Sequence, residues 1–279
     1  MLSGIFVPSF TAFTKTGDLN LTATIDHAQW LLETDISGLI PFGTFGEGAS
    51  LSVDEMKLIT SKLLEVKGDK RIIPTLITNS LGSIKEFLSW ASSAGITHTM
   101  VLPPSYYRPA SPQSMVELFD QIVKFSDVQI IAYNIPACAI ELPIEVVEQT
   151  GVWGVKDSSG DLAATQRYLA TGKGLLVGSD KLLIPALAAG ANGGILGLAN
   201  LFPTEFTAAY QLFQAGDTAA AQAKVDSVTQ IINQVVPANS SFGEIIGYVK
   251  SFAKQVIPTD LGYMRMPVTS QTAPTIDFK

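Results

Sequence analysis

Short runs of apolar residues recur along the 279-residue chain, separated by longer stretches in which apolar residues follow a helical period. The runs lack polar alternation, which is typical of strands in a parallel sheet covered by helices on its faces. They predict eight strands, at residues 5–7, 38–40, 72–76, 99–102, 128–133, 152–156, 175–177 and 194–196.

The stretches between these runs carry signals for helix starts. Ser52 with Glu55 has the spacing of a capping box, Ser111-Pro112 fits an N-cap followed by the first helical residue, and Asp161 precedes an alanine-rich stretch. Pro143 opens a further turn. Eight strand and helix units by about residue 215 predict a (β/α)8 barrel, and a doubly wound sheet is the alternative.

Residues 218–235 and 244–256 also have a helical pattern. We expect two parts, a barrel over residues 1–216 and a C-terminal helical segment over residues 217–279 that packs on the barrel.

Composition narrows the class of partner. The formal net charge is −7, the sequence pI is about 4.8, and 47% of the residues are hydrophobic. Neither a basic patch nor a Lys/Arg run is present, which argues against nucleic acid or an anionic membrane and favours a small polar substrate. Cys138 is the single cysteine, and the first residues lack the pattern of a secretory signal, so we expect a cytoplasmic protein.

Lys156 is the most informative residue, because it ends the apolar run Val152–Val155, where a surface lysine has little reason to lie. Either it is a paired cation of the core, or desolvation keeps its amine uncharged so that the amine attacks a carbonyl. The other lysines fall at predicted helix or turn positions.

Active sites of this fold lie at the carboxyl ends of the strands. There the chain carries a glycine-rich turn, three tyrosines, the lysine and a polar pair, at Gly43–Gly48, Tyr106, Tyr107, Tyr133, Lys156 and Gly178–Asp180. A glycine-rich turn with a threonine hydroxyl can cradle a carboxylate, because its amides approach the anion closely. With a nucleophilic amine and proton donors, the inventory suits Schiff-base chemistry on a 2-oxo acid.

Each feature also has a structural interpretation. The turn at Gly43–Gly48 could be a tight connection, Tyr106 and Tyr107 could pack on the rim, and Tyr133 could turn its hydroxyl toward water. Asp157 could point away from the barrel lumen, since side chains alternate along a strand. The glycines around the eighth strand fit close packing better than a phosphate site; they are Gly190, Gly193, Gly194 and Gly197.

Metal catalysis is disfavoured by counting. A zinc aldolase needs a cluster of histidines, and the chain has His27 in a predicted helix and His98 before the fourth strand. Such lone histidines are more often surface or core-edge residues. We expect neither a metal nor another cofactor, so that Lys156 must supply the electron sink.

Four segments in this order resemble the dihydrodipicolinate synthase and N-acetylneuraminate lyase family, a resemblance that runs from residue 4 to roughly residue 265. They are residues 43–47 (Gly-Thr-Phe-Gly-Glu), 104–107 (Pro-Ser-Tyr-Tyr), 133–136 (Tyr-Asn-Ile-Pro) and 154–161 (Gly-Val-Lys-Asp-Ser-Ser-Gly-Asp). The resemblance implies pyruvate bound as a Schiff base on Lys156, with Tyr133 as proton donor and acceptor.

The same resemblance implies further roles. Thr44 and the Phe45 amide would hold the carboxylate, in the turn that Gly43 opens, with Gly178 and the Ile195 backbone also at the substrate. Tyr107 would reach across a subunit interface to complete a relay, and a homotetramer built as a dimer of dimers is implied.

Two departures bear on the second substrate. The synthases have two threonines where this chain has Thr44-Phe45, and they carry an arginine where this chain has Ala137–Glu141. Losing that arginine removes a charge-assisted contact to the carboxylate of aspartate semialdehyde. The ending Gly262-Tyr-Met-Arg-Met-Pro267 also resembles archaeal 2-keto-3-deoxygluconate aldolases, whereas Thr-Phe-Gly-Glu is similar to hydratase-aldolases that act on aromatic aldehydes.

We therefore expect a class I, Schiff-base pyruvate aldolase that cleaves a 2-keto-3-deoxy sugar acid to pyruvate and an aldehyde. The alternatives are a dihydrodipicolinate synthase that condenses pyruvate with aspartate semialdehyde, and a catalytically idle barrel that senses a 2-oxo acid.

Overall fold

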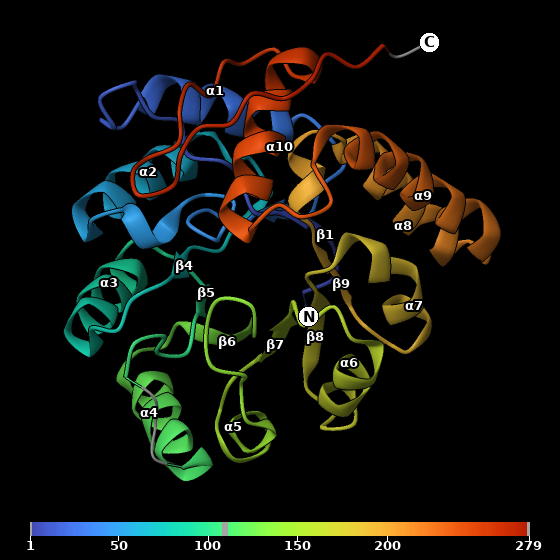
Figure 1. Ribbon diagram of the computed structural model, residues 1–279. Helices are drawn as coiled ribbons and strands as arrows, with labels where there is room; N and C mark the ends of the chain where they lie inside the picture. The colour runs from blue at the N-terminus through green and yellow to red at the C-terminus, as the bar shows by residue number, and fades with distance from the viewer. Residues whose placement is uncertain (1, 108–110, 278–279) are drawn as a thin grey trace.

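The computed structural model describes residues 2–107 and 111–277, and this part of the chain contains one curved sheet of parallel strands surrounded by helices (Figure 1). Every paired strand runs parallel to its neighbour. The strands are β1 (Gly4–Val7), β2 (Gly38–Leu39), β3 (Arg71–Ile72), β4 (Thr75–Leu76), β5 (His98–Val101), β6 (Gln129–Asn134), β7 (Gly154–Asp157), β8 (Gly174–Val177) and β9 (Gly193–Ile195).

The sheet closes into a barrel through the predicted third strand, which is divided into β3 and β4. These two pieces are the ends of the strand order β3-β2-β1-β9-β8-β7-β6-β5-β4. Between them, the Ile73 amide donates to the Leu39 carbonyl at 2.9 Å on one side, and the Met100 amide donates to the Pro74 carbonyl at 2.8 Å on the other. Pro74 has no amide proton to donate, which accounts for the interruption. The (β/α)8 barrel is confirmed, with this one strand split.

Helices form the outer ring around the strands (Figure 1). The predicted N-caps are present, since Ser52 and Glu55 form a capping box and the side chains of Ser111 and Asp161 accept from the first turns. The helices are α1 (Leu21–Leu32), α2 (Val53–Val66), α3 (Leu81–Ser93), α4 (Pro112–Phe125), α5 (Ile144–Gln149), α6 (Leu162–Leu169), α7 (Leu183–Ala188), α8 (Pro203–Gln214), α9 (Thr218–Val235) and α10 (Phe242–Val256). None of the helices in the described part of the chain combines the length and apolar character needed to cross a bilayer.

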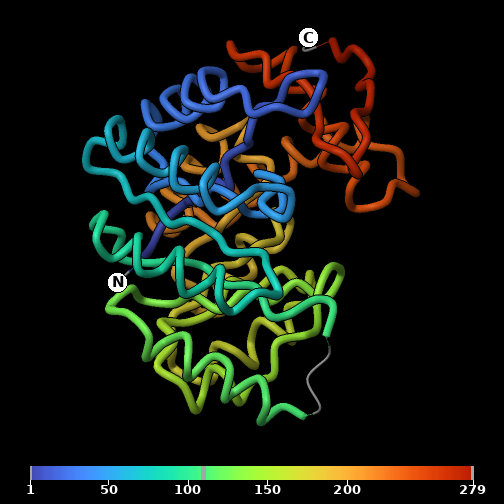
Figure 2. The backbone as a smooth tube through the Cα atoms, turned by 90° about the vertical axis from the view of Figure 1, so that its left-hand side faces the viewer, coloured from blue at the N-terminus to red at the C-terminus, as the bar shows by residue number. Residues whose placement is uncertain are grey.

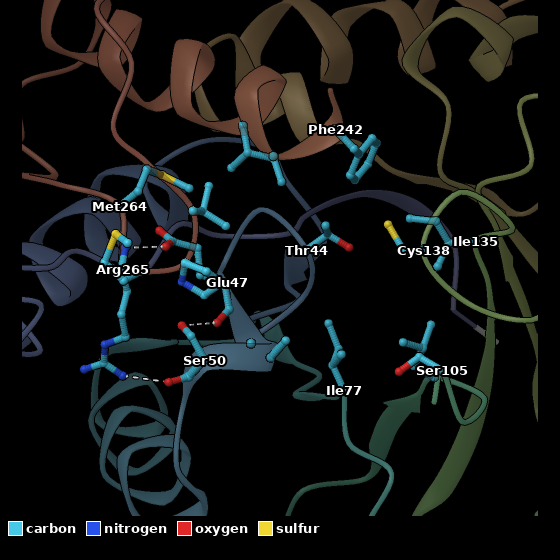
Figure 3. A pocket seen from close by; sticks show the side chains of 18 residues that line it. Thr44, Glu47, Ser50, Ile77, Ser105, Ile135, Cys138, Phe242, Met264 and Arg265 are labelled. Carbon is cyan, nitrogen blue, oxygen red and sulfur yellow. Dashed lines mark hydrogen bonds between the residues drawn. The ribbon is translucent and has the colours of Figure 1, made fainter. Parts of the chain in front are cut away.

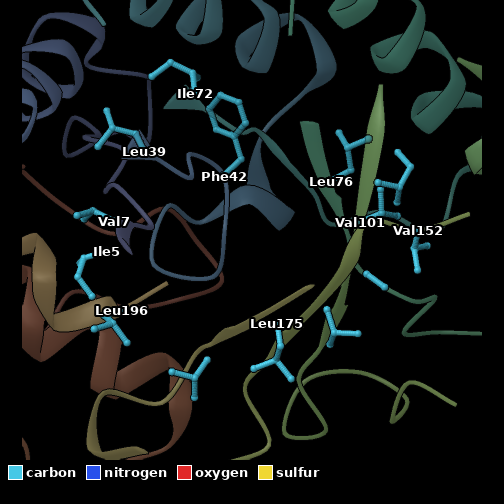
Figure 4. Close-up of a cluster of buried hydrophobic side chains, with 14 of the residues drawn as sticks. Ile5, Val7, Leu39, Phe42, Ile72, Leu76, Val101, Val152, Leu175 and Leu196 are labelled. Atoms are coloured by element: carbon cyan, nitrogen blue, oxygen red, sulfur yellow. The ribbon is translucent and has the colours of Figure 1, made fainter. Parts of the chain in front are cut away.

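Alternate residues of the strands belong to two separate apolar clusters. Outward-facing side chains such as Ile5, Val7, Leu39 and Leu175 pack against the ring of helices (Figure 4). A second cluster fills the lumen of the barrel; its strand members include Phe6, Met100, Ile131, Tyr133, Leu176 and Ile195. This period of two decides which polar residues of a strand can face the lumen.

The C-terminal helices extend the barrel. Helix α9 packs beside α8, and α10 crosses near α1, where the C-terminal segment also lies (Figures 1 and 2). A third apolar cluster joins α10 to the chain after β1; it includes Phe10, Ala12, Val249, Phe252, Leu261 and Met264. Phe13 also makes an antiparallel bridge to Tyr263. This packing brings the start of α10 to the carboxyl ends of the strands.

Candidate active site

Lys156 lies in the lumen, near the carboxyl end of β7. Its neighbours across the sheet are Tyr133 on β6 and Leu176 on β8, both members of the lumen cluster. Its residue is only 4% exposed, and its Nζ lies 4.2 Å from the centroid of the Tyr133 ring. Within residues 2–107 and 111–277, it makes no hydrogen bond or ion pair. This disfavours the interpretation of Lys156 as a paired core cation.

Tyr133 and Thr44 are joined by a hydrogen bond. The Tyr133 side chain is buried in the lumen, and its hydroxyl lies 3.1 Å from Thr44 Oγ1, with either hydroxyl able to donate. The alternative in which Tyr133 turns its hydroxyl toward water is therefore wrong. The pair forms a short proton path from the ring beside Lys156 to the turn after β2.

Asp157 faces away from Lys156, as the alternation along a strand predicts. Its carboxylate accepts from Asn134 Nδ2 at 2.8 Å, from the amide and hydroxyl of Ser159 at 3.0 Å each, and from Thr165 Oγ1 at 2.7 Å. These bonds tie the end of β7 to β6 and to the start of α6. Asp157 is a structural residue that fixes the strand on which Lys156 is placed.

A cavity of about 190 Å³ contains most of the predicted site. Its lining includes Lys156, Tyr133, Thr44, Phe45, Gly178 and Ile195. A Cβ at Gly178 would lie 2.9 Å from Lys156 Cε and would collide with Ser158 Oγ, so glycine is required there to leave room for the lysine.

Two predicted residues do not line this cavity. Gly43 is buried within the turn, where its carbonyl accepts from the Gly48 amide at 3.2 Å. Tyr107 is 76% exposed, and its ring packs edge-on against Tyr106, with 5.0 Å between the ring centroids. In this single chain, Tyr107 therefore does not join the Tyr133 and Thr44 hydroxyls.

The Phe45 ring forms one wall of the cavity. It packs against Phe10, with 5.8 Å between centroids, and a Cβ at Gly197 would overlap its ring atoms. At Gly193, likewise, a Cβ would collide with the backbone of Gly4. Close packing explains these two glycines without a phosphate site.

A larger cavity of about 660 Å³ adjoins the first, and the two share Thr44, Ile135 and Phe242 (Figure 3). Its walls are mainly apolar and come from the strand ends, from the start of α10 and from the C-terminal segment. The lining includes Ile77, Leu102, Ile246, Met264, Met266 and Val268. A substrate bound on Lys156 could extend into this space.

Asp180 is a polar residue near Lys156 whose role the sequence left open. Burial raises the pKa of its carboxyl to about 6, against weaker opposing effects of the Leu198 amide and of Lys156. The Leu198 amide donates to Asp180 Oδ1 at 3.1 Å. Asp180 thereby joins the loop after β8 to the loop after β9.

Sequence reasoning missed a second buried lysine. Lys250, on α10, is 3% exposed and donates to the Thr11 carbonyl, to Glu47 Oε1 and to the Tyr263 carbonyl, each at 2.7 Å. Burial lowers the pKa of Lys250, and the Glu47 carboxylate opposes that shift. Helical periodicity alone placed Lys250 among ordinary helical lysines, and that expectation is wrong.

Arg265 extends this group of charges. Its amide donates to Glu47 Oε2 at 2.8 Å, and its guanidinium binds both carboxylate oxygens of Glu55, at 2.7 and 3.0 Å. The guanidinium also donates to the carbonyls of Gly17 and Ser50 (Figure 3). The Arg of the Gly-Tyr-x-Arg-x-Pro ending therefore fastens the C-terminal segment to the turn that carries Thr44.

The two histidines lie apart from the site. His27 is fully buried, not at the surface or core edge as expected, and its Nε2 lies 3.0 Å from Asn200 Oδ1. Burial lowers the pKa of His27 to about 4. Among the described residues, no group of three or more His, Cys, Asp or Glu side chains is arranged so that it could hold a metal ion.

Comparison with known proteins agrees with this architecture. The model of the dihydrodipicolinate synthetase family matches residues 1–273. A 4-hydroxy-tetrahydrodipicolinate synthase from Methanothrix thermoacetophila is 31% identical over 234 residues, which cover 80% of this chain and 78% of that protein. An uncharacterized DapA-like lyase from Thermococcus onnurineus is 27% identical, with 88% and 87% covered.

Solved structures show the same fold. A prophage protein of the dihydrodipicolinic acid synthase family from E. coli K12, in complex with pyruvate, superposes with a TM-score of 0.87 at 23% identity, over 97% of this chain and 93% of that one. A 2-keto-3-deoxygluconate aldolase variant from Sulfolobus solfataricus gives 0.87 at 22% identity, over 96% and 90%. A sialic acid aldolase from Ruminococcus gnavus gives 0.88 at 19% identity, over 97% and 90%.

A family match over nearly the whole chain, joined to a closed barrel with a buried lysine in its lumen, leads to one conclusion: this protein belongs to the dihydrodipicolinate synthetase family of class I aldolases and lyases, which are carbon–carbon lyases.

Proposed function

We propose that the protein forms a Schiff base between Lys156 and pyruvate and reversibly cleaves a 2-keto-3-deoxy sugar acid, such as 2-keto-3-deoxygluconate, to pyruvate and an aldehyde. One observation carries the proposal. The Lys156 amine lies in a cavity beside the Tyr133 ring, whose hydroxyl is hydrogen-bonded to Thr44. A buried amine next to a proton relay suits imine and enamine chemistry.

The residues fit the steps of aldol cleavage. The Lys156 amine attacks the C2 ketone and loses water, which gives a protonated imine. Tyr133 accepts the proton of the C4 hydroxyl while the C3–C4 bond breaks, and the aldehyde leaves. The electron pair of that bond is held as an enamine, which Tyr133 then protonates at C3. Water hydrolyses the resulting imine and releases pyruvate from the free amine.

The carboxylate of the 2-oxo acid would lie on the turn after β2. The Thr44 hydroxyl and the Phe45 amide would donate to it, in the turn opened by Gly43, while Gly178 and the Ile195 backbone would form the other side. Gly178 leaves space next to Lys156, and Ile195 lines the same cavity. Grouped amides and a hydroxyl can hold an anion without a further cation.

The aldehyde side favours an uncharged partner. Lys156 is the sole cationic side chain among the described residues that line the smaller cavity. Arg265 lines the larger one, but its guanidinium is already bound to Glu55 and to two carbonyls. A second carboxylate on the substrate would therefore lack a bidentate partner, which disfavours aspartate semialdehyde and favours glyceraldehyde.

A second candidate is dihydrodipicolinate synthase activity. The observation that favours it is the 31% identity to the synthase from Methanothrix thermoacetophila. A third, a 2-oxo acid sensor, is disfavoured because binding alone does not need the Lys156 nucleophile.

The test is pyruvate release from 2-keto-3-deoxygluconate, coupled to lactate dehydrogenase. We expect turnover by the wild type and by Lys57→Ala, a matched change at an exposed ion pair, and none by Lys156→Ala. Wild-type turnover restricted to aspartate semialdehyde would establish the synthase instead. Pyruvate that borohydride traps on Lys156, without turnover of either substrate, would support the sensor.

Assembly and location complete the proposal. A cytoplasmic homotetramer, with Tyr107 of one subunit reaching the relay of its partner, would give a role to an exposed tyrosine ring. Light scattering after size exclusion tests the tetramer. If Tyr107 completes the relay, Tyr107→Phe should lower turnover without changing the mass of the particle.

A further inference from the structure

The turn that carries Thr44 is tightly closed on itself. The Glu47 amide donates to the Thr44 carbonyl at 3.2 Å, and the Gly46 carbonyl accepts from Thr11 Oγ1 at 2.7 Å. At Gly46 a Cβ would lie 2.8 Å from the Ser9 carbonyl oxygen, and at Gly48 it would collide with the Phe42 carbonyl. Any shift of this turn therefore moves the Thr44 hydroxyl relative to Tyr133.

Glu47 adopts a backbone conformation that favours glycine, with φ of 53°. Such a conformation in a glutamate persists where the surroundings hold it in place. Both of its carboxylate oxygens are bound, Oε1 by Lys250 Nζ at 2.7 Å and Oε2 by the Arg265 amide at 2.8 Å. The side chains of Glu47 and Lys250 are both nearly inaccessible to solvent.

Lys250 uses all three of its protons to join three segments. Besides Glu47, it binds the Thr11 carbonyl after β1 and the Tyr263 carbonyl in the C-terminal segment. The Phe13 ring lies beneath both cations, 4.9 Å from Lys250 Nζ and 4.3 Å from Arg265 Cζ. Buried ion pairs stabilise a fold no better than apolar residues of the same volume, and their best-attested use is to fix one arrangement of the chain.

We propose that Glu47 and Lys250 are positioning residues for catalysis: their buried ion pair fixes the turn after β2 so that the Thr44 hydroxyl stays within hydrogen-bonding distance of Tyr133. Neither side chain lines the cavity that contains Lys156, so the pair acts through Thr44 and not on the substrate. The inference rests on the Schiff-base chemistry proposed above, and is independent of which aldehyde is the partner.

The test is a double-mutant cycle on the exchange of the pyruvate methyl protons with deuterated water, followed by NMR. This exchange requires the imine, the enamine and proton transfer, but no aldehyde. Thr44→Val, Glu47→Gln and the double variant are compared with the wild type, per folded active site. We expect Glu47→Gln to slow exchange about tenfold in the wild type and to have no effect once Thr44 is valine, because contacting residues couple.

Borohydride trapping of pyruvate by the same variants separates positioning from a general loss of structure. We expect each variant to trap pyruvate on Lys156 to the same extent as the wild type, since imine formation does not need the Thr44 hydroxyl in place. Should Glu47→Gln not fold, the cycle is built on Glu47→Gln/Lys250→Met, which leaves no charge buried alone.

Multiplicative slowing in the double variant would overturn the proposal, as would a lower melting temperature with unchanged exchange. A wild type that neither traps pyruvate nor exchanges its protons would overturn the Schiff-base function itself. A wild type that exchanges protons but leaves 2-keto-3-deoxygluconate intact would overturn the sugar-acid assignment alone.

Discussion

Two lysines are buried to nearly the same extent in this barrel, and their surroundings are opposite. Lys250 is 3% exposed, and its ammonium is bound by two carbonyls and the Glu47 carboxylate. Lys156 is 4% exposed and lies beside the Tyr133 ring, without a hydrogen bond or ion pair to any residue that the structure describes.

The difference separates a structural cation from an amine available for reaction. Removing an ammonium from water is costly unless hydrogen bonds and an opposite charge replace the solvent. Lys250 has that compensation in full. Lys156 has only the face of an aromatic ring and the more distant Asp180 carboxyl, so its burial opposes stability and keeps the amine free for a carbonyl.

The largest contrast is expected from replacing each lysine by methionine. Lys156→Met should lower borohydride trapping of pyruvate by at least about 10³-fold, because the nucleophile is gone. Its free energy of unfolding should stay the same or rise by about 1 kcal/mol, because no bonded charge is lost. Mass spectrometry and urea unfolding measure the two effects. A marked loss of stability would mean that the amine is paired after all.

Lys250→Met should have the reverse effect on stability. It leaves the Glu47 carboxylate buried without a cation, so we expect a loss of about 3 to 5 kcal/mol in the free energy of unfolding. Adding Glu47→Gln should recover part of that loss. Lys57→Met, at the exposed pair with Glu86, is the control and should cost less than about 1 kcal/mol. Equal urea midpoints for Lys250→Met and the wild type would remove the contrast.

Tyr133→Phe sharpens the distinction within the Lys156 site. We expect proton exchange into pyruvate to fall on the order of 10²-fold, while pyruvate is still trapped on Lys156. Tyr168→Phe is a matched control, because its buried hydroxyl donates to the Leu142 carbonyl outside the cavity. That control should keep full exchange and lose about 1 kcal/mol of stability. Normal exchange by Tyr133→Phe would exclude its hydroxyl as the proton carrier.

The smallest effect is expected at Asp180, whose pKa burial raises to about 6 from 3.8. Between these values the folded protein holds a proton that the unfolded chain releases. The stability that this carboxyl contributes is thus complete below about pH 4 and lost as the pH rises through 6. Relative to Asp180→Asn, the wild type should lose about 1 to 3 kcal/mol from pH 4 to 7 in urea unfolding. A difference that does not vary with pH would contradict the shift.

The fold could be predicted because strand burial leaves a local signal. Apolar runs without polar alternation mark strands covered on both faces, and period-two alternation correctly turned Asp157 away from Lys156. The split of the third strand follows from Pro74, but strand closure on both sides of that residue depends on partners far away in sequence.

The Lys250 site could not be predicted for the same physical reason. Glu47 and Lys250 are 203 positions apart, and within α10 the lysine has the spacing of any helical residue. Phe45 and Tyr107 illustrate the limit further. Whether the Phe45 ring blocks or lines a cavity depends on Gly197, and what Tyr107 contacts depends on more than one chain.

The register between β6 and β7 has an evolutionary consequence. Tyr133 and Lys156 meet because these two positions are paired across adjacent strands. A deletion of one residue upstream within β7 would turn Lys156 toward the helices and bring a neighbour with different chemistry, Val155 or Asp157, into the lumen. We therefore expect descendants of this sequence to change freely in composition around the cavities while tolerating no change of length in these two strands.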